Sequence, residues 1–384
     1  MAKSGLISLV SIKQKLRPYY VNVRGWRTAR KIVVIESDDW GSIRMPSAKA
    51  YKKCLAAGFR VDENPYEKYD SLASNDDLEL LFDLLSGYKD SCGKNPVITA
   101  NSLVANPDFE KIRDSNFEHY FFEPISKTFD RYPMHDRCLE LWREGLAGDL
   151  FFMQSHGREH LNVSKFMNAL RREDPDALFG FNLQIPGGMS RDGSGTCNHY
   201  IEALIYDTEA DKKLKLEIIL EGLELFETAF GYRSESFIPP NYIWSPDFDE
   251  NVSHRGVDFY QGNRKMKEPA ENGLKLHTRT LGEKNRFGQT YLVRNAVFEP
   301  TLQKKKNKDP VQDCLRQINA AFLMNKPAII CSHRINYVGF LDTKNRDANL
   351  IQLKDLIDTI QRKWPDVEFM TSVQLGKLMA GEDD

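Results

Sequence analysis

The sequence contains side chains of the types that metal-assisted hydrolysis uses. His156 and His160 lie four residues apart, a spacing that can bring two imidazoles to one side of a helical turn or tight loop, within reach of one ion. Asp38 and Asp39 are adjacent, so at a strand end one carboxylate can bind metal while the other faces a substrate. Two histidines and one carboxylate leave positions on a divalent ion open for water and a carbonyl, and the free carboxylate can deprotonate that water.

His333 is the third histidine of interest, and it is followed by Arg334, Asn336 and Tyr337. Its ordinary pKa lies near working pH, so it could protonate a leaving amine. Each of these groups could also have a purely structural role, or none. His333 could be a neutral histidine bonded to backbone, the aspartate pair could cap a following helix, and two histidines at this spacing also arise by chance.

Apolar runs that end in these polar groups are expected to position them. Residues 31–35 form a β-branched run that leads into the polar residues 36–41, and residues 150–154 and 328–332 lead into the histidines. Such runs are typical of buried parallel strands. Because loops at the carboxyl ends of parallel strands surround the ligand in α/β folds, we expect the polar groups to meet there.

Other elements alternate along the chain. A strand at 96–101 and an amphipathic helix at 75–88 complete a β-α-β unit with the first strand. Further helices are expected at 135–144, 211–230 and 349–363, and further strands at 236–240 and 367–371. This alternation predicts an α/β fold with a parallel barrel rather than an all-β fold or a helix bundle.

We expect one barrel domain at 31–384, preceded by a basic arm at 1–30 that has no acidic residue. The arm could form an amphipathic helix that makes peripheral contact with an anionic membrane or an acidic partner, or it could pack across the bottom of the barrel. An aromatic-rich insertion is expected at about 102–134. The glycine-rich segment 186–195 could be a lid or substrate clamp, and it lacks the ending that a phosphate-binding P-loop requires.

Bulk properties exclude several classes of protein. The 384 residues are 41% hydrophobic and 28% charged, as in a globular protein. The net charge of -2 argues against a dedicated nucleic-acid binder, which needs a cationic surplus. The six cysteines have no CxxC spacing and are expected to be free thiols. No apolar run approaches the roughly 18 residues of a membrane span, and no signal-type stretch opens the chain, so we expect a cytoplasmic protein.

The ordered motifs resemble those of the NodB-like polysaccharide deacetylases, carbohydrate esterase family four. Residues 36–39 look like the family's T-F-D-D-type motif, which would make Asp38 the base and Asp39 a metal ligand. Residues 156–160 are similar to its H-S/T-x-x-H motif, and both of their histidines would bind metal. The run ending at His333 resembles its L-x-H motif, which would make His333 the catalytic acid.

Residues 237–242 resemble the third motif, R-x-P-F/Y, and this implies that backbone near Asn241 donates to the oxyanion, with Tyr242 beside the substrate. Ile238 stands where an arginine normally pairs with the catalytic aspartate. A substitute is therefore expected from Arg334, Arg233 or Arg264, or the base is tuned differently.

The resemblance implies a distorted (β/α) barrel of seven or eight strands, with a long insertion between the first and second metal motifs. It implies one divalent metal ion, with zinc (Zn) first and cobalt, nickel or manganese as alternatives. The implied activity removes an N-acetyl group from a sugar or glycan intermediate, which could be nucleotide- or lipid-linked. Trp40, Tyr242 and Arg334 are the candidate substrate contacts. The alternatives are a barrel hydrolase acting on another amide or an O-acetyl ester, and a catalytically silent glycan-binding protein.

Overall fold

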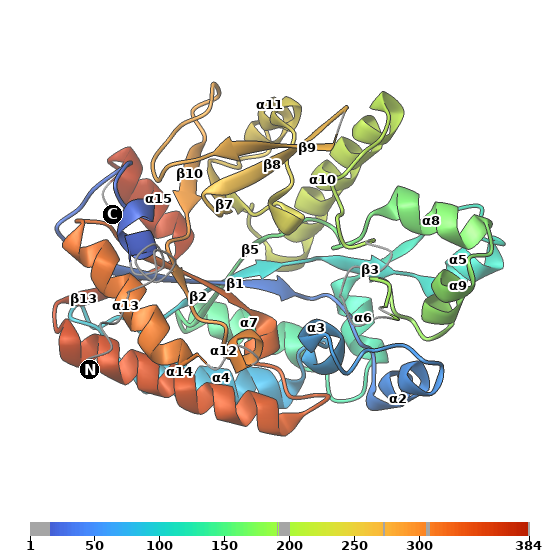
Figure 1. The fold of residues 1–384 in the computed structure, drawn as a ribbon, viewed down its shortest axis with the longest axis horizontal. Helices are drawn as coiled ribbons and strands as arrows, with labels where there is room; N and C mark the ends of the chain where they lie inside the picture. The colour runs from blue at the N-terminus through green and yellow to red at the C-terminus, as the bar shows by residue number, and fades with distance from the viewer. Residues whose placement is uncertain (1–15, 190, 192–199, 272, 305–307, 383–384) are drawn as a thin grey trace, which may run out of the picture.

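The computed structural model describes residues 16–189, 191, 200–271, 273–304 and 308–382. Its centre is a parallel sheet whose strands follow the order β10-β7-β6-β5-β2-β1-β12-β11, with β13 paired to the first half of β1 (Figure 1). These strands are β1 (Lys31–Trp40), β2 (Ile98–Ser102), β5 (Phe151–Ser155), β6 (Ser236–Phe237), β7 (Phe259–Gly262), β10 (Thr290–Val293), β11 (Ala296–Val297), β12 (Ala328–His333) and β13 (Val367–Met370). The predicted fold class, a distorted (β/α) barrel, is confirmed by this topology.

The two end strands of the sheet, β10 and β11, are joined by only two residues, and these residues close the barrel. The Arg294 backbone N donates to Gly262 O at 2.9 Å, and the Asn295 backbone N donates to Ile329 O at 3.1 Å. The link therefore bonds to β7 on one side and to β12 on the other. Arg294 is thereby held at the carboxyl end of β10, beside the ends of the other strands.

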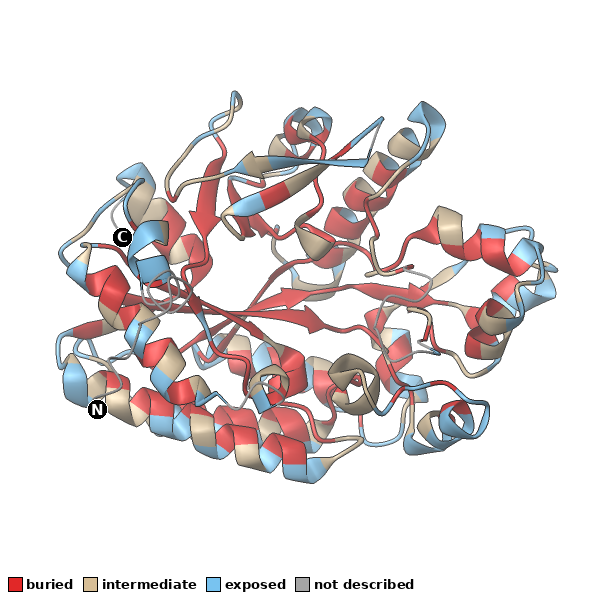
Figure 2. Cartoon of the chain, viewed as in Figure 1, coloured by how far each residue is buried: buried red, intermediate tan, exposed pale blue. Residues whose placement is uncertain are grey.

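Two apolar layers hold β1 in place, and its side chains alternate between them. Val33 and Ile35 belong to the core cluster under the outer helices, while Ile32 and Val34 belong to the cluster that includes β7 and β10 residues. Alternation of this kind is the period of a strand. Figure 2 shows the sheet as the most continuously buried part of the molecule.

Helices cover the sheet in the β-α order that the sequence predicts. One face carries α4, α7, α13 and α14, which lie together along the lower edge of Figure 1. The helices are α2 (Ala48–Ala56), α3 (Pro65–Tyr69), α4 (Asn75–Ser86), α5 (Phe109–Asp114), α6 (Ile125–Arg131), α7 (Cys138–Ala147), α8 (Val163–Arg171), α9 (Pro175–Asn182), α10 (Glu209–Phe230), α11 (Asp249–Ser253), α12 (Pro300–Gln303), α13 (Pro310–Leu323), α14 (Thr343–Lys363) and α15 (Ser372–Ala380).

The helix ends follow local sequence signals. Ser74 caps α4 in a reciprocal capping box with Asp77, and Thr371 does the same for α15 with Gln374. These side chains satisfy backbone N–H groups that have no partner inside the helix. The predicted helix at 349–363 in fact begins earlier, at Thr343, because Asp342 provides the cap.

Two small antiparallel hairpins stand outside the sheet, β3 (Ala105–Pro107) with β4 (Phe122–Pro124), and β8 (Lys265–Ala270) with β9 (Gly273–Thr278). The first hairpin, with α5 and α6, occupies the stretch predicted as an insertion. It lies with α2, α3, α8 and α9 beyond the carboxyl end of β1, at the right of Figure 1. This hairpin and these short helices therefore lie next to the polar carboxyl ends of the strands.

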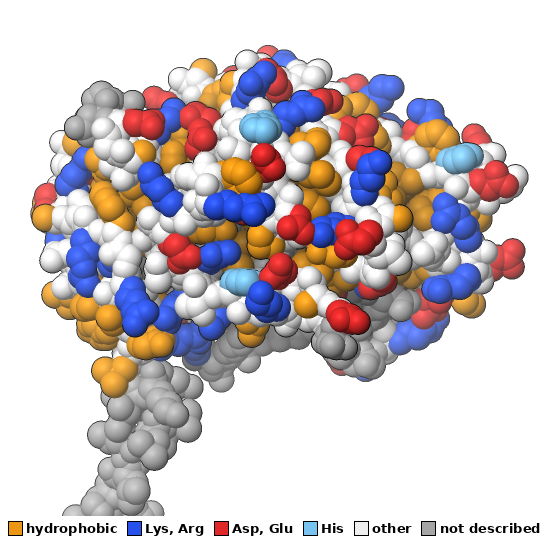
Figure 3. All heavy atoms as spheres, turned by 90° about the horizontal axis from the view of Figure 1, so that it is seen from above, with side chains coloured by type: hydrophobic (Ala, Val, Ile, Leu, Met, Phe, Trp, Pro, Cys, Tyr) orange, Lys and Arg blue, Asp and Glu red, His pale blue; other side chains and the backbone are white. Residues whose placement is uncertain are grey.

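Half of the predicted arm, residues 1–15, lies outside the described residues, as does half of the glycine-rich segment. Among the described helices, none is both long and apolar enough to cross a membrane. The five described cysteines are free thiols. Figure 3 shows one face of the molecule, on which acidic and basic side chains are interspersed without a broad patch of either sign.

Candidate active site

A bulge near the end of β1 turns the two adjacent aspartates toward different partners. The pairing of β1 with β2 shifts register between Ser37 and Trp40, and Asp39 has φ 74. A bulge re-aims side chains in this way, and a positive φ is unusual for a residue with a Cβ. Asp38 then lies opposite His333 of β12 in the strand register, while Asp39 faces the loop after β5.

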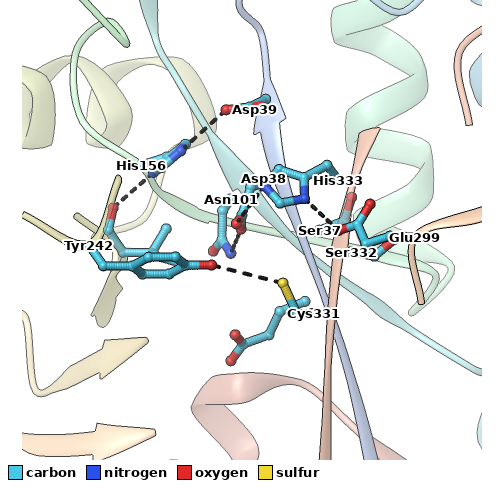
Figure 4. Close-up of polar contacts among 12 residues, drawn as sticks. Ser37, Asp38, Asp39, Asn101, His156, Tyr242, Glu299, Cys331, Ser332 and His333 are labelled. Atoms are coloured by element: carbon cyan, nitrogen blue, oxygen red, sulfur yellow. Dashed lines mark hydrogen bonds and ion pairs between the residues drawn. The ribbon is translucent and has the colours of Figure 1, made fainter. Parts of the chain in front are cut away.

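Asp39, His156 and His160 form a candidate metal triad. Their ligand atoms all lie within 4.8 Å of one another. Asp39 Oδ1 is 3.5 Å from His156 Nε2 and 3.8 Å from His160 Nε2, and Figure 4 shows Asp39 and His156 facing each other. His156 Nδ1 is 2.8 Å from Ile238 O. A carbonyl can only accept, so Nδ1 carries the proton and Nε2 presents its lone pair toward Asp39.

The electrostatics of the triad suit metal ligands. Burial alone would raise the pKa of the Asp39 carboxyl, but the Arg44 guanidinium, 3.3 Å away, and the histidines hold that pKa well below its usual value. Burial and then the charge of Arg44 lower the pKa of His160 to about 3. Asp39 is therefore ionised and His160 neutral at pH 7, which are the protonation states that a cation requires.

The loop between the two histidines is held by contacts that only glycine permits. Gly157 has φ 104, a conformation that L side chains rarely adopt. A Cβ at Gly222 of α10 would lie 2.7 Å from the Arg158 backbone N. Arg158 also pairs with Glu159 at 2.5 Å. The glycine at the second position of this motif is thus explained by backbone conformation.

Asp38 is held by a buried arginine that the sequence reasoning did not find. Arg294 donates from Nη2 to Asp38 Oδ1 at 2.6 Å and from Nη1 to Oδ2 at 2.7 Å, and its Nε donates to Glu36 Oε2 at 2.5 Å. Asn101 Nδ2 donates to Asp38 Oδ1 at 2.7 Å. Burial on its own would raise the pKa of Asp38, but Arg294 lowers it to about 2. Asp38 is therefore an ionised, fixed carboxylate.

The three arginines considered as substitutes for the missing motif arginine do not contact Asp38. Arg334 is fully buried, and its Nε donates to Asp70 Oδ1 at 2.9 Å. Arg233 pairs with a glutamate on the surface. Arg264 lies over the Tyr20 ring. The expectation that one of them substitutes was wrong, because Arg294 from the end of β10 occupies that place.

His333 sits between two carboxylates. Its Nδ1 is 2.5 Å from Glu299 Oε1, and its Nε2 is 3.7 Å from Asp38 Oδ2. The Tyr66 ring packs against it in a T-shaped arrangement, with ring centroids 5.7 Å apart. Burial would lower the pKa of His333, but Glu299 outweighs burial and raises it well above the usual value. His333 is therefore a protonated imidazole whose Nε2–H faces the pocket.

The Glu299→Gln variant should lower the pKa of His333, because a neutral amide no longer stabilises the imidazolium. The His333 ring proton followed by NMR across a pH series measures this shift. The pair's contribution to folding is present below the unfolded histidine pKa of about 6.5 and is lost as pH rises through the raised folded pKa. The loss of stability in the variant should therefore be largest below about pH 6.5 and should fade as pH rises through the raised folded pKa. Glu140→Gln on the surface of α7 is the control, and an unmoved His333 titration in Glu299→Gln would contradict the assignment.

These groups line one cavity of about 480 Å³. Of the residues predicted from sequence it brings together Asp38, Asp39, His156, His160, Asn241, Tyr242 and His333. Asn241 and Tyr242 both have positive φ, and they follow β6 in a tight turn whose Tyr242 N donates to Pro239 O at 2.9 Å.

Two predicted substrate contacts lie elsewhere. Trp40 is 1% exposed and stacks on Tyr337 in the core, with ring centroids 6.4 Å apart. Its indole N donates to Ser37 Oγ at 3.0 Å. Arg334 lies behind His333 and is not part of the cavity lining. The prediction that these two side chains contact substrate in the cavity is not supported by their positions.

The sequence reasoning also missed Glu299 and Arg44. Glu299 precedes α12, and its carboxylate accepts from Asn336 Nδ2 at 2.8 Å as well as from His333. The signal that could have found Arg294 was present, since Tyr291–Val293 is an apolar run followed by a charged residue. Glu299 and Arg44 have no such local signal.

Comparison by sequence finds no family model and no curated protein that matches the chain. Among solved structures the chain is similar to a proposed polysaccharide deacetylase of Mycobacterium smegmatis, with 10% identity, coverage of 94% of this chain and 93% of that one, and a TM-score of 0.44. It is similar to an allantoinase, with 12% identity, coverage of 92% of this chain and 91% of that one, and a TM-score of 0.46.

A third similar structure is the 4-α-glucanotransferase of Thermococcus litoralis, with 10% identity and a TM-score of 0.43. The match covers 92% of this chain but only 40% of that enzyme, so the chain spans less than half of its length. The three proteins have different activities. The function of this chain is therefore inferred from its own pocket.

Proposed function

We propose that the chain is a metal-dependent hydrolase that removes an N-acetyl group from a sugar or glycan intermediate. The observation that carries the proposal is the convergence of three groups on one cavity: the triad of Asp39, His156 and His160, the fixed carboxylate Asp38, and the imidazolium His333. Together they supply a cation site, a base and an acid, which are the parts that hydrolysis of an amide requires.

Asp39, His156 and His160 would hold one divalent ion, with zinc first because two imidazoles and one carboxylate leave coordination open in the manner of catalytic zinc sites. Such an ion, when bound, polarises an acyl carbonyl and lowers the pKa of water. The donor set fits this role, since the His156 ring is oriented by Ile238 O and His160 is neutral.

The other residues would act on protons and on the oxyanion. Asp38, ionised and held by Arg294, takes the proton from the attacking water. The Asn241 backbone N–H, in the turn after β6, donates to the oxyanion as it forms. His333 donates its Nε2 proton to the departing nitrogen, and Glu299 stabilises the imidazolium until that transfer. The products are a free amine and acetate.

The His160→Ala variant should lose most of its bound metal, because it removes one of three ligands. The measurement is metal content per chain after purification with zinc and dialysis, by elemental analysis. His119→Ala, at an exposed histidine, is the matched control and should hold metal as the wild type does. Full occupancy in the His160→Ala protein would remove this histidine from the ligand set.

Activity is tested by acetate release from a panel of N-acetylated sugars, including nucleotide- and lipid-linked ones. The panel also contains an O-acetyl ester and a non-sugar acetamide, so that the competing hydrolase activities are read in the same assay. Release should disappear on chelation and return on addition of metal. A protein that binds glycan but hydrolyses none of these compounds with metal restored would instead be a silent binding protein.

A further inference from the structure

The cavity lining is divided between a polar part and an apolar part. The polar part is the site described above. The apolar part, called here the apolar wall, consists of Met45, Ile185, Met189 and Ile201. Met45 lies between β1 and α2, and Ile185 and Met189 follow α9. The proposed function uses none of these side chains.

The apolar wall is fixed by a core cluster of its own. Met45, Ile185 and Met189 pack with Cys54 and Phe59 in that cluster. Cys54 Sγ lies 3.1 Å from Met189 Sδ. Met45, Ile185 and Met189 are at most 5% exposed. A wall backed by packed core is preorganised, so an apolar ligand group can bind to it without first ordering the protein.

Two polar side chains near the wall already have partners within the protein. Arg44 pairs with Asp39 and Asp70, and Asn64 Oδ1 accepts from the Tyr66 backbone N at 3.1 Å. A sugar hydroxyl pressed against the wall would lose its water partners, and the four apolar side chains of the wall would offer it no hydrogen bond in return. A hydrocarbon chain would gain by leaving water. The wall therefore suits a part of the substrate that an acetylated sugar alone does not have.

Resting on the proposed function, we propose that the substrate is an amphipathic amide, with an apolar chain of several carbons that lies against the apolar wall. The chain can come from either of two parts of the substrate. It is an acyl group longer than acetyl, or it is an apolar aglycone attached to the sugar. Both present the same chemistry to the wall, and the volume of about 480 Å³ exceeds the needs of an acetyl methyl group.

The test is a pair of substrate series assayed with the metal-loaded wild type. One series lengthens the N-acyl group of glucosamine from acetyl to octanoyl, and the other keeps N-acetyl and lengthens an alkyl aglycone. In one series kcat/KM should rise by about fourfold per methylene over the first several carbons, which corresponds to about 0.8 kcal/mol per buried methylene. The series that rises identifies the source of the chain. Hydrolysis that is flat along both series would overturn the inference and leave the hydrolase function standing.

The Met45→Gln variant should flatten the rising series, since it places an amide of similar size in the wall. Met45→Leu keeps the apolar volume and should keep the slope. Met134→Gln, at a side chain 53% exposed outside the cavity lining, controls for the substitution itself. If kcat/KM rises with chain length in Met45→Gln as steeply as in the wild type, the apolar chain of the substrate does not lie against Met45. If Met45→Gln does not fold, the wild-type series and Met45→Leu still decide the question.

Binding without turnover separates this inference from the proposed function. Calorimetry with chelated protein should detect an octyl glycoside or an N-octanoyl amine, with a negative heat-capacity change, and should detect the short-chain analogue at least tenfold more weakly. If no amide in either series is hydrolysed but binding depends on chain length, the hydrolase proposal fails, while the inference that the apolar wall binds an apolar chain is supported. If neither hydrolysis nor binding depends on chain length, the apolar wall does not bind an apolar chain and the inference is wrong.

Discussion

The Asp38→Asn variant should lower kcat for amide hydrolysis by about 10²- to 10⁴-fold, the range that a positioned proton-transfer group contributes. The substitution keeps the shape of the side chain but removes its ability to accept the proton of the attacking water. Arg294 retains its 2.5 Å bond to Glu36, so the fold should persist. The measurement is single-substrate kinetics of acetate release on protein whose metal content has been determined.

Metal content makes this result specific to Asp38. The metal ligands Asp39, His156 and His160 are untouched, so occupancy should equal that of the wild type. Asp83→Asn, at an exposed position of α4, is the control for the chemical change and should be fully active. Turnover by Asp38→Asn within tenfold of the wild type, at full metal occupancy, would exclude Asp38 as the base.

The parts of the site that could be predicted are those that a local sequence pattern indicates. Each of β1, β5 and β12 is an apolar run that ends at a polar group, and parallel strands bring their carboxyl ends to one edge of the sheet. That rule alone brings Asp38, His156 and His333 to the same cavity. The alternation of helices and strands was sufficient for the fold class.

The wrong predictions have identifiable physical causes. Strict alternation along β1 would put Trp40 on the same face as Asp38, toward the cavity. The bulge between Ser37 and Trp40 turns the indole to the other face, into the helix-side core. Arg334 follows His333 directly, so its side chain leaves on the opposite side and pairs with Asp70.

Long-range pairing could not be predicted, since nothing local specifies it. β10 and β11 are short strands, and the sequence between them does not reveal that they are the two ends of one sheet. Only closure of the barrel brings Arg294 to Glu36 and Asp38 of β1, far away in the chain. The arginine that pairs with Asp38 therefore comes from the end of β10 through closure of the barrel, not from a residue close to it in the sequence.

Arg294→Met should destabilise the protein by about 3–5 kcal/mol at pH 7, the usual cost of removing one partner from a buried ion pair. The Arg294 side chain is 1% exposed, and those of Glu36 and Asp38 are 0% and 5% exposed. Methionine fills similar space but leaves two buried carboxylates without a compensating charge. Urea unfolding of wild type and variant measures the difference. Arg233→Met, at an exposed ion pair, should cost little.

The pH dependence of this loss tests its electrostatic origin. In the wild type Arg294 lowers the pKa of Asp38 to about 2, so the stability from this pair is present above the unfolded aspartate pKa of about 3.9 and is lost as pH falls through about 2. Without Arg294, burial raises the folded pKa, so the variant binds protons on folding and its penalty fades as pH falls toward 4. The gap between wild type and variant should therefore narrow from pH 7 to pH 4. A gap that stays constant over this range would mean that Arg294 stabilises the barrel by packing rather than by charge.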